Sequence, residues 1–133
     1  MMKKIIVLLI ALLLAVPTAF AATYQIDTAH SQIHFKIAHL VVFKVRGTFN
    51  DFSGSVDIDL PNKTLKAAAA TIQIASIDTR NLKREKHLLS ADFFDVSKYP
   101  EMRFVSKQIS GSGDNISVTG DLTIKGITKE VIL

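Results

Sequence analysis

Three histidines near the start of the chain have the residue type and spacing closest to those of a metal site. On a helix, His30 and His34 would share a face and could bind zinc together, with His39 nearby. Here apolar and polar residues alternate around them, which predicts a strand, and four residues of a strand span about 13 Å. A zinc ion holds each histidine nitrogen at about 2 Å, so one ion cannot bridge that distance. We therefore expect no metal at these histidines.

Other catalytic patterns are sparse. Asp57 and Asp59 are expected on the outward face of one strand, with no basic or nucleophilic partner in the pattern. The chain has no cysteine and no G-x-S-x-G sequence, and the turn at 111–113 has too few glycines for a phosphate-binding loop. The residues therefore predict neither catalysis nor a cofactor.

Residues 1–21 have the features of a secretory signal peptide. Two lysines precede the apolar run 5–16, and Ala-Phe-Ala at 19–21 provides a small-x-small cleavage pattern. Twelve apolar residues are too few to cross a bilayer, which takes about 20. We predict a periplasmic protein with a mature domain at 22–133 and no stable membrane insertion. Cleavage leaves 14 Lys and Arg against 12 Asp and Glu, and this small excess gives no strong electrostatic case for nucleic acid or an anionic membrane as a partner, so we expect no nucleic acid partner.

The elements that would position any site are strands. Apolar and polar side chains alternate near 33–37, 55–60, 68–74, 101–105 and 116–125, with turn residues at 50–51, 61–63, 111–115 and 125–126. Such alternation is typical of antiparallel sheet with one buried face. The segment 80–89 interrupts it and predicts a short surface helix capped by Asp78 or Thr79. We expect an all-β, mainly antiparallel fold that curls into a barrel or sandwich.

The residues expected to face inward are mostly phenylalanine and small residues. They are Phe35, Phe49, Phe52, Phe104, Gly54, Gly120, Ala68 and Ala70. Bulky side chains fill a small barrel, whereas a mixture with glycine and alanine can leave a void, so both a filled core and a cavity fit this pattern. His39 points with Phe35 and Ile37, where it either bonds a backbone group or contacts a ligand.

A series of short blocks runs in order along the mature chain. They are DTAHS (27–31), Phe35 with Ile37 and His39, VRGTF (45–49), FSG (52–54), SIDT (76–79), KHL (86–88), DFFDV (92–96), YP (99–100) with Phe104, and GDLTIKG (120–126). In this order and spacing, the blocks resemble the YceI-like family of exported lipid-binding proteins.

The resemblance implies a lipocalin-like antiparallel β-barrel with a short helical insertion and an elongated apolar cavity. It also implies a non-enzymatic carrier or scavenger of polyisoprenoid chains, such as isoprenoid quinones, or of other long amphiphiles. The candidate ligand-binding residues are Phe35, Ile37, His39, Phe49, Phe52, Phe93, Phe94 and Phe104. Two alternatives stay open: an envelope stress-response module that captures a partner through the helix face 80–86, and a lipid-modifying enzyme with His39 or His87 as base.

Two features depart from the family pattern. Val41 and Val42 stand where the family more often has a glycine after His-Leu, which is expected to reshape one loop. The chain also stops at Leu133, within an apolar strand, where family members continue through further strands. An apolar strand end at a sheet edge exposes unpaired backbone. We therefore expect missing C-terminal strands, an open barrel, and a homodimer formed by pairing of two copies along this edge.

Overall fold

The computed structural model describes residues 21–39 and 43–133, the side chains of His39 and Phe43 excepted. The predicted leader, apart from Ala21, and the departures at Val41 and Val42 lie outside these residues, and they stay predictions.

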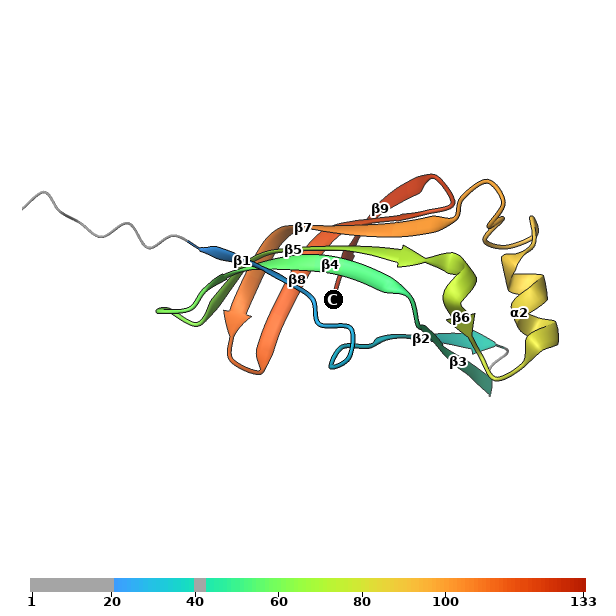
Figure 1. The fold of residues 1–133 in the computed structure, drawn as a ribbon, viewed down its shortest axis with the longest axis horizontal. Coiled ribbons are helices and arrows are strands. Elements are labelled where there is room, and N and C mark those ends of the chain that lie inside the picture. Colours follow the sequence, from blue (N-terminus) through green and yellow to red (C-terminus); the bar gives the residue numbers. More distant parts are fainter. Residues whose placement is uncertain (1–20, 40–42) are drawn as a thin grey trace, which may run out of the picture.

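The described chain forms two antiparallel sheets, one with the order β1-β4-β5-β7-β8-β9 and one with the order β2-β3-β6 (Figure 1). The strands of the larger sheet are β1 Ala22–Gln25, β4 Phe52–Asp59, β5 Thr64–Gln73, β7 Glu101–Ser112, β8 Asn115–Ile124 and β9 Ile127–Ile132. Those of the smaller sheet are β2 Ile33–His39, β3 Phe43–Phe49 and β6 Ile77–Asp78. The two helical elements are the 3-10 turn η1 Ile74–Ser76 and the α-helix α2 Leu82–Leu89.

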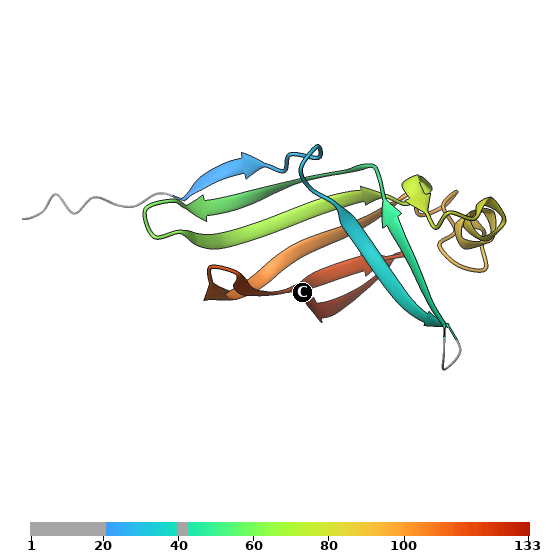
Figure 2. The ribbon, with the colours of Figure 1, turned by 90° about the horizontal axis from the view of Figure 1, so that it is seen from below.

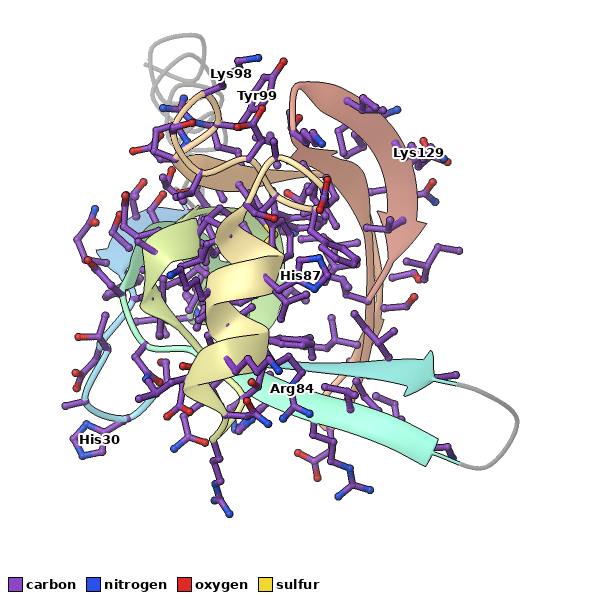
Figure 3. The ribbon with its side chains drawn as sticks, turned by 90° about the vertical axis from the view of Figure 1, so that its right-hand side faces the viewer. His30, Arg84, His87, Lys98, Tyr99 and Lys129 are labelled. Carbon is purple, nitrogen blue, oxygen red and sulfur yellow. The ribbon has the colours of Figure 1, made fainter. Side chains whose placement is uncertain are left out.

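The larger sheet curls, and the β2–β3 hairpin crosses its concave face diagonally (Figure 2). Viewed from one end, the sheet arches over the hairpin and α2 stands across the opening between them (Figure 3). No strand pairing among the described residues joins the two sheets, so the barrel is not closed. The prediction of an open, mainly antiparallel β fold with one short helix is confirmed.

The chain passes between the two sheets four times, after β1, β3, β5 and β6, and the crossings after β3 and after β5 are neighbours. At these points the Asn50 amide donates to the Ser76 carbonyl at 3.2 Å, and the Gln73 amide donates to the Asp51 carbonyl at 2.9 Å. Backbone hydrogen bonds therefore tie one crossing to the other. The predicted turn at 50–51 is the crossing after β3.

Every segment predicted from alternating side chains is a strand, but the end of β4 differs from the pattern. The register of β4 against β5 shifts between Asp57 and Ile58. Beyond the shift, Asp59 is only 5% exposed, whereas Leu60 is 58% exposed. Asp59 turns inward because its carboxylate accepts hydrogen bonds from the backbone and side-chain nitrogens of Asn62, which closes the turn. The expectation that Asp59 faces outward beside Asp57 is wrong.

At the C-terminal edge of the larger sheet, β9 pairs with β8 alone among the described strands. Ile127 and Ile132 on this edge strand are exposed. Pairing of two copies along β9 stays a prediction.

Helix α2 begins at Leu82, and its N-cap is Asn81 rather than the predicted Asp78 or Thr79. The Asn81 side chain accepts a hydrogen bond from the Arg84 amide at 3.0 Å, which satisfies one of the free amides at a helix start. The Asp78 carboxylate instead accepts a hydrogen bond from the backbone amide of Arg80. The cap therefore lies further along the chain because Asp78 is engaged in the turn that leads to the helix.

Thr79 is the anchor between α2 and the smaller sheet, and it is 5% exposed. Glu85 accepts hydrogen bonds from the amides of Thr79, at 2.7 Å, and Asn81, at 3.2 Å. Arg84 donates to the Thr79 hydroxyl and carbonyl. These bonds hold the helix against the end of β6, with Leu88 and Leu89 packed on the core.

Replacing Glu85 tests this anchor. Hydrogen bonds from the Thr79 and Asn81 amides to the charged carboxylate hold the pKa of Glu85 below its ordinary value of 4.5. A lowered carboxyl pKa stabilises the fold above the ordinary value, and the stabilisation is lost as pH falls through the lowered pKa. We expect Glu85→Gln to lower the urea midpoint at pH 7, and the difference from wild type to shrink as pH falls below 4.5. Glu130→Gln, which removes only an exposed ion pair with Lys107, is the control and should change the midpoint little. A difference that stays constant with pH would contradict this role.

Candidate functional site

A cleft of about 660 Å³ lies between the concave face of the larger sheet and the β2–β3 hairpin. Its lining is apolar except at one side, where Ser31, Gln32 and His34 lie at the start of β2. The larger sheet contributes Phe52, Ala70, Ile72, Met102, Phe104, Leu122 and Ile124. The hairpin and neighbouring segments contribute Ile26, Ile33, Phe35, Ile37, Phe49, Phe94 and Leu133.

Strand register explains why the apolar side chains gather on one side. Ala70 on β5 is the direct partner of Phe104 on β7, which in turn is the partner of Leu122 on β8. Directly paired residues of antiparallel strands share a face, so these side chains form one row across the sheet. Ile72 and Met102 form the neighbouring row, two residues along each strand.

Three phenylalanines close the end of the cleft that lies toward α2. Phe49 is 4% exposed, and its ring centroid lies 5.3 Å from that of Phe35 and 6.2 Å from that of Phe94. Aromatic pairs at these separations attract beyond the area they bury. The three residues come from β2, β3 and the segment after α2, so their packing joins hairpin and helix.

Glycines lie directly beneath side chains of the cleft. A Cβ atom built on Gly120 would lie 2.5 Å from both Cζ of Phe104 and the Val105 carbonyl oxygen. A Cβ on Gly47 would collide with the Phe35 ring, and one on Gly54 with the Ile26 side chain. The sequence pattern fitted either a filled core or a void, and at these glycines the structure has a filled core. Side chains cover them, and the cleft exists because the two sheets stand apart.

Six of the predicted ligand-binding residues lie in the cleft lining. They are Phe35, Ile37, Phe49, Phe52, Phe94 and Phe104. Phe93 does not line the cleft, because the turn after α2 directs Phe94 inward and leaves Phe93 49% exposed, with its ring edge-on to His87. The side chain of His39 lies outside the described residues.

Sequence reasoning missed several lining residues from the larger sheet. Ile72, Met102, Leu122 and Ile124 were recognised as alternating apolar residues but were not assigned to the site. Their strand parity was the available signal. Ile26 follows β1 outside any alternating run, so no pattern identified it.

The described histidines make separate short-range contacts. His30 lies 2.7 Å from the Asp27 carboxylate, and this hydrogen bond is the main reason that the pKa of Asp27 is lowered. His34 contacts the Gln32 side-chain oxygen at 2.7 Å, and His87 lies 3.4 Å from Asp92. In the described ranges, no group of three or more His, Cys, Asp or Glu residues could hold a metal ion.

Within the part of the chain that the structure describes, no helix is both long enough and apolar enough to cross a bilayer.

Fold and site together define an antiparallel β protein with an apolar cleft between a curled sheet and a hairpin. The family model of the YceI-like domain matches residues 24–133. The chain belongs to the YceI-like family.

Relatives and solved structures agree with this assignment. The chain is 46% identical over 125 residues to UPF0312 protein plu2095 of Photorhabdus laumondii and 40% identical over 125 residues to Protein YceI of Escherichia coli O157:H7. Each match covers 92% of this chain, which spans 65% of the length of either relative.

Two crystal structures extend the comparison. Burkholderia cenocepacia BcnA is 34% identical, with a TM-score of 0.70 over 80% of this chain and 67% of its own. The Campylobacter jejuni YCEI protein is 39% identical, with a TM-score of 0.65 over 82% of this chain and 64% of its own.

Substitution of Gly120 tests how the cleft wall is packed. We expect Gly120→Ala to lower the free energy of unfolding by about 1–3 kcal/mol, because the new methyl group must displace the Phe104 ring or the β7 backbone. Ser110→Ala, at an exposed position of β7, is the control and should change stability by less than about 0.5 kcal/mol. Urea unfolding of both variants measures the difference. Equal stability of Gly120→Ala and wild type would show that Phe104 does not rest on Gly120.

Proposed function

We propose that this protein is a periplasmic, non-enzymatic carrier or scavenger of long-chain amphiphilic lipids, with polyisoprenoids such as isoprenoid quinones as the leading class. The observation that carries the proposal is the cleft of about 660 Å³ with its apolar lining. This volume lies within the usual range of small-molecule sites, about 300–1,000 Å³. The proposal concerns a chain that spans 65% of the length of its relatives.

The energetics favour a chain-like apolar ligand. Each buried methylene contributes about 0.8 kcal/mol, so a five-carbon isoprene unit gains about 3–4 kcal/mol before costs. Ordering a flexible tail offsets part of that gain. Because apolar walls distinguish chains by only about 1–3 kcal/mol per methylene, we expect weak selectivity among similar tails.

The polar groups of the lining suggest where a headgroup would lie. Ser31, Gln32 and His34 adjoin one another at the start of β2, while the row Ala70, Phe104 and Leu122 is wholly apolar. A ligand with one polar end fits this division, its hydroxyl or carbonyl group near His34 and its tail along the sheet.

The cleft provides an apolar surface for a lipid to bind, and its described residues do not form an arrangement suited to proton transfer. General acid–base catalysis needs a group within about 2.6–3.2 Å of the proton that it moves. Among the described residues that line the cleft there is no Asp or Glu side chain, and His87 lies outside the lining, 63% exposed beside Asp92. These placements support a carrier over an enzyme that uses His87 as base.

Native mass spectrometry and solvent extraction test the proposal directly. We expect protein purified from a periplasmic extract to carry an extractable polyprenyl or similar long-chain lipid, one per chain. Phe35→Ala should reduce the recovered lipid several-fold, because it removes an aromatic wall of the cleft. Phe93→Ala removes an equal ring outside the lining and should recover as much lipid as wild type. Protein that is empty as purified and takes up no added isoprenoid would contradict the proposal.

Export makes a separate prediction. When the full chain is expressed, we expect the protein recovered from the periplasm to lack residues 1–21 and to begin at Ala22. Ala21→Arg should block cleavage and leave the precursor, with a mass near 14.6 kDa, in the membrane fraction. Intact-mass measurement of each cell fraction is the readout, and an uncleaved wild-type chain in the cytoplasm would contradict export.

A further inference from the structure

Basic residues gather in two segments of the chain. Residues 33–49 and 79–89 contain seven Lys and Arg and one acidic residue, Glu85. The rest of the chain after residue 21 contains seven Lys and Arg against eleven Asp and Glu. The small net charge of the mature chain therefore conceals a strong division between one positive region and a negative remainder.

The first segment is the hairpin, whose outer face is positive. Lys36 alternates along β2 with the cleft residues Phe35 and Ile37, so it lies on the opposite face. Its direct partner across the hairpin is Arg46, and like charges placed opposite one another on adjacent strands destabilise a sheet. Among the described residues, neither Lys36 nor Arg46 lies within ion-pair distance of a carboxylate.

The hairpin and the start of the helix meet at a shared hollow. A pocket of about 390 Å³ is lined by Arg46 and Thr48 of β3, by Asp78 and Arg80 beyond them, and by His34 of β2. Asp78 is the carboxylate of this lining, and one of its oxygens accepts the Arg80 amide. Two arginines, Arg46 and Arg80, therefore line a hollow large enough for a phosphate group.

Helix α2 continues the positive region and adds an apolar side chain. Leu82 is 85% exposed at the first turn, next to Lys83 and close to Arg80. The acidic residue of this segment, Glu85, uses one carboxylate oxygen to bind the Thr79 and Asn81 amides. Figure 3 shows Arg84 of α2 beside the hairpin, whereas Lys98 and Lys129 lie well away from it.

We propose that this basic face, defined as Lys36, Lys44, Arg46, Arg80, Leu82 and Lys83, docks the protein reversibly on an anionic bilayer. Cations around an exposed leucine are typical of surfaces that lie in the membrane interface, where the leucine enters the acyl boundary. A nucleic acid would match the charges but would leave Leu82 without an apolar partner, whereas an anionic bilayer supplies both the charge and the apolar interior that such a surface enters. The observations therefore favour a lipid surface.

The position of β2 links docking to the cleft. This edge strand presents Lys36 outward and Phe35 with Ile37 inward, so contact of the basic face with a bilayer brings one lip of the cleft to the membrane. An amphiphile could then pass between bilayer and cleft without crossing open water. Docking goes beyond the proposed lipid carriage and does not require that any particular lipid occupy the cleft.

Vesicle flotation tests the basic face. The probes are vesicles of phosphatidylcholine alone and of phosphatidylcholine with phosphatidylglycerol, mixed with exported, leader-free protein. Binding is expected only to the anionic vesicles, and it should weaken as added salt screens the charges. Each Lys or Arg near an anionic surface contributes about fivefold to partitioning.

Two matched variants separate position from total charge. The variant K36Q/R46Q/R80Q/K83Q should lose at least about tenfold in partitioning to the anionic vesicles. The variant K63Q/K66Q/K98Q/K129Q removes the same charge from other surfaces and should lose less than about threefold. Leu82→Ser should lower partitioning several-fold while leaving its salt dependence unchanged, because it removes apolar insertion and no charge. Circular dichroism melts establish that each variant is folded. If K36Q/R46Q/R80Q/K83Q is not folded, the double variants K36Q/K83Q and K63Q/K129Q replace the two quadruple variants.

Several outcomes would overturn docking. These are equal binding to neutral and anionic vesicles, an equal loss in the two charge variants, or retention on heparin without vesicle binding, which would assign the face to a soluble polyanion. Wild-type protein that carries extractable lipid but binds no anionic vesicles would overturn docking and leave the carrier function standing. Wild-type protein that binds the vesicles but carries and takes up no lipid would overturn the carrier function and leave docking standing.

Discussion

The angle between the two sheets is the constraint on which the rest of this structure depends. The chain passes from the smaller to the larger sheet at Asn50 and Asp51 and returns through η1, and backbone hydrogen bonds from Asn50 to Ser76 and from Gln73 to Asp51 tie the two crossings together. Phe49, one residue before the first crossing, packs against Phe35 and Phe94. Because the described strands of the two sheets do not pair, these contacts and the core beside them hold the hairpin over the sheet. As a consequence, among the described strands, the edge strand β2 of the smaller sheet and the edge strand β9 of the larger sheet do not pair with each other.

This arrangement explains how a protein with well-packed walls can contain a large apolar space. Where the sheets converge, near α2, side chains such as Phe49, Ile74 and Ile77 are almost fully buried. Farther along, the sheets diverge, and Ile37 on the hairpin is 54% exposed. Buried apolar surface stabilises the closed end, while the apolar surface left uncovered at the open end is a surface that a hydrocarbon chain could cover.

The hairpin gives a single strand two different surfaces. Successive side chains of a strand point to opposite faces, so β2 alternates cleft residues with polar and basic residues. The like-charged pair of Lys36 and Arg46 lies on a strand pair whose other face is apolar, and an anionic surface outside the sheet would relieve the repulsion between them. Lipid carriage and membrane docking would thus use opposite faces of the same two strands.

Local periodicity and turn chemistry were enough to predict β2, β4, β5, β7 and β8, most turns and the apolar face of these strands. Phe35, Phe49, Phe52 and Phe104 were identified on the correct face for this reason. Departures arose where a short-range side-chain hydrogen bond overrode the alternating or capping pattern. Asp59 turns inward to Asn62 after a register shift, and Asn81 caps the helix while Asp78 binds the Arg80 amide.

Which apolar residues face the cleft and which pack elsewhere depends on contacts between segments that are distant in the sequence. Phe93 and Phe94 are adjacent and chemically identical, yet only Phe94 reaches Phe49, because the turn after α2 fixes its direction. Gly47 and Gly120 likewise support aromatic rings rather than leaving space, since the rings come from neighbouring strands. Parity along a strand assigns a residue to a face, but the separation of two sheets is set by crossings and packing between residues distant in the sequence.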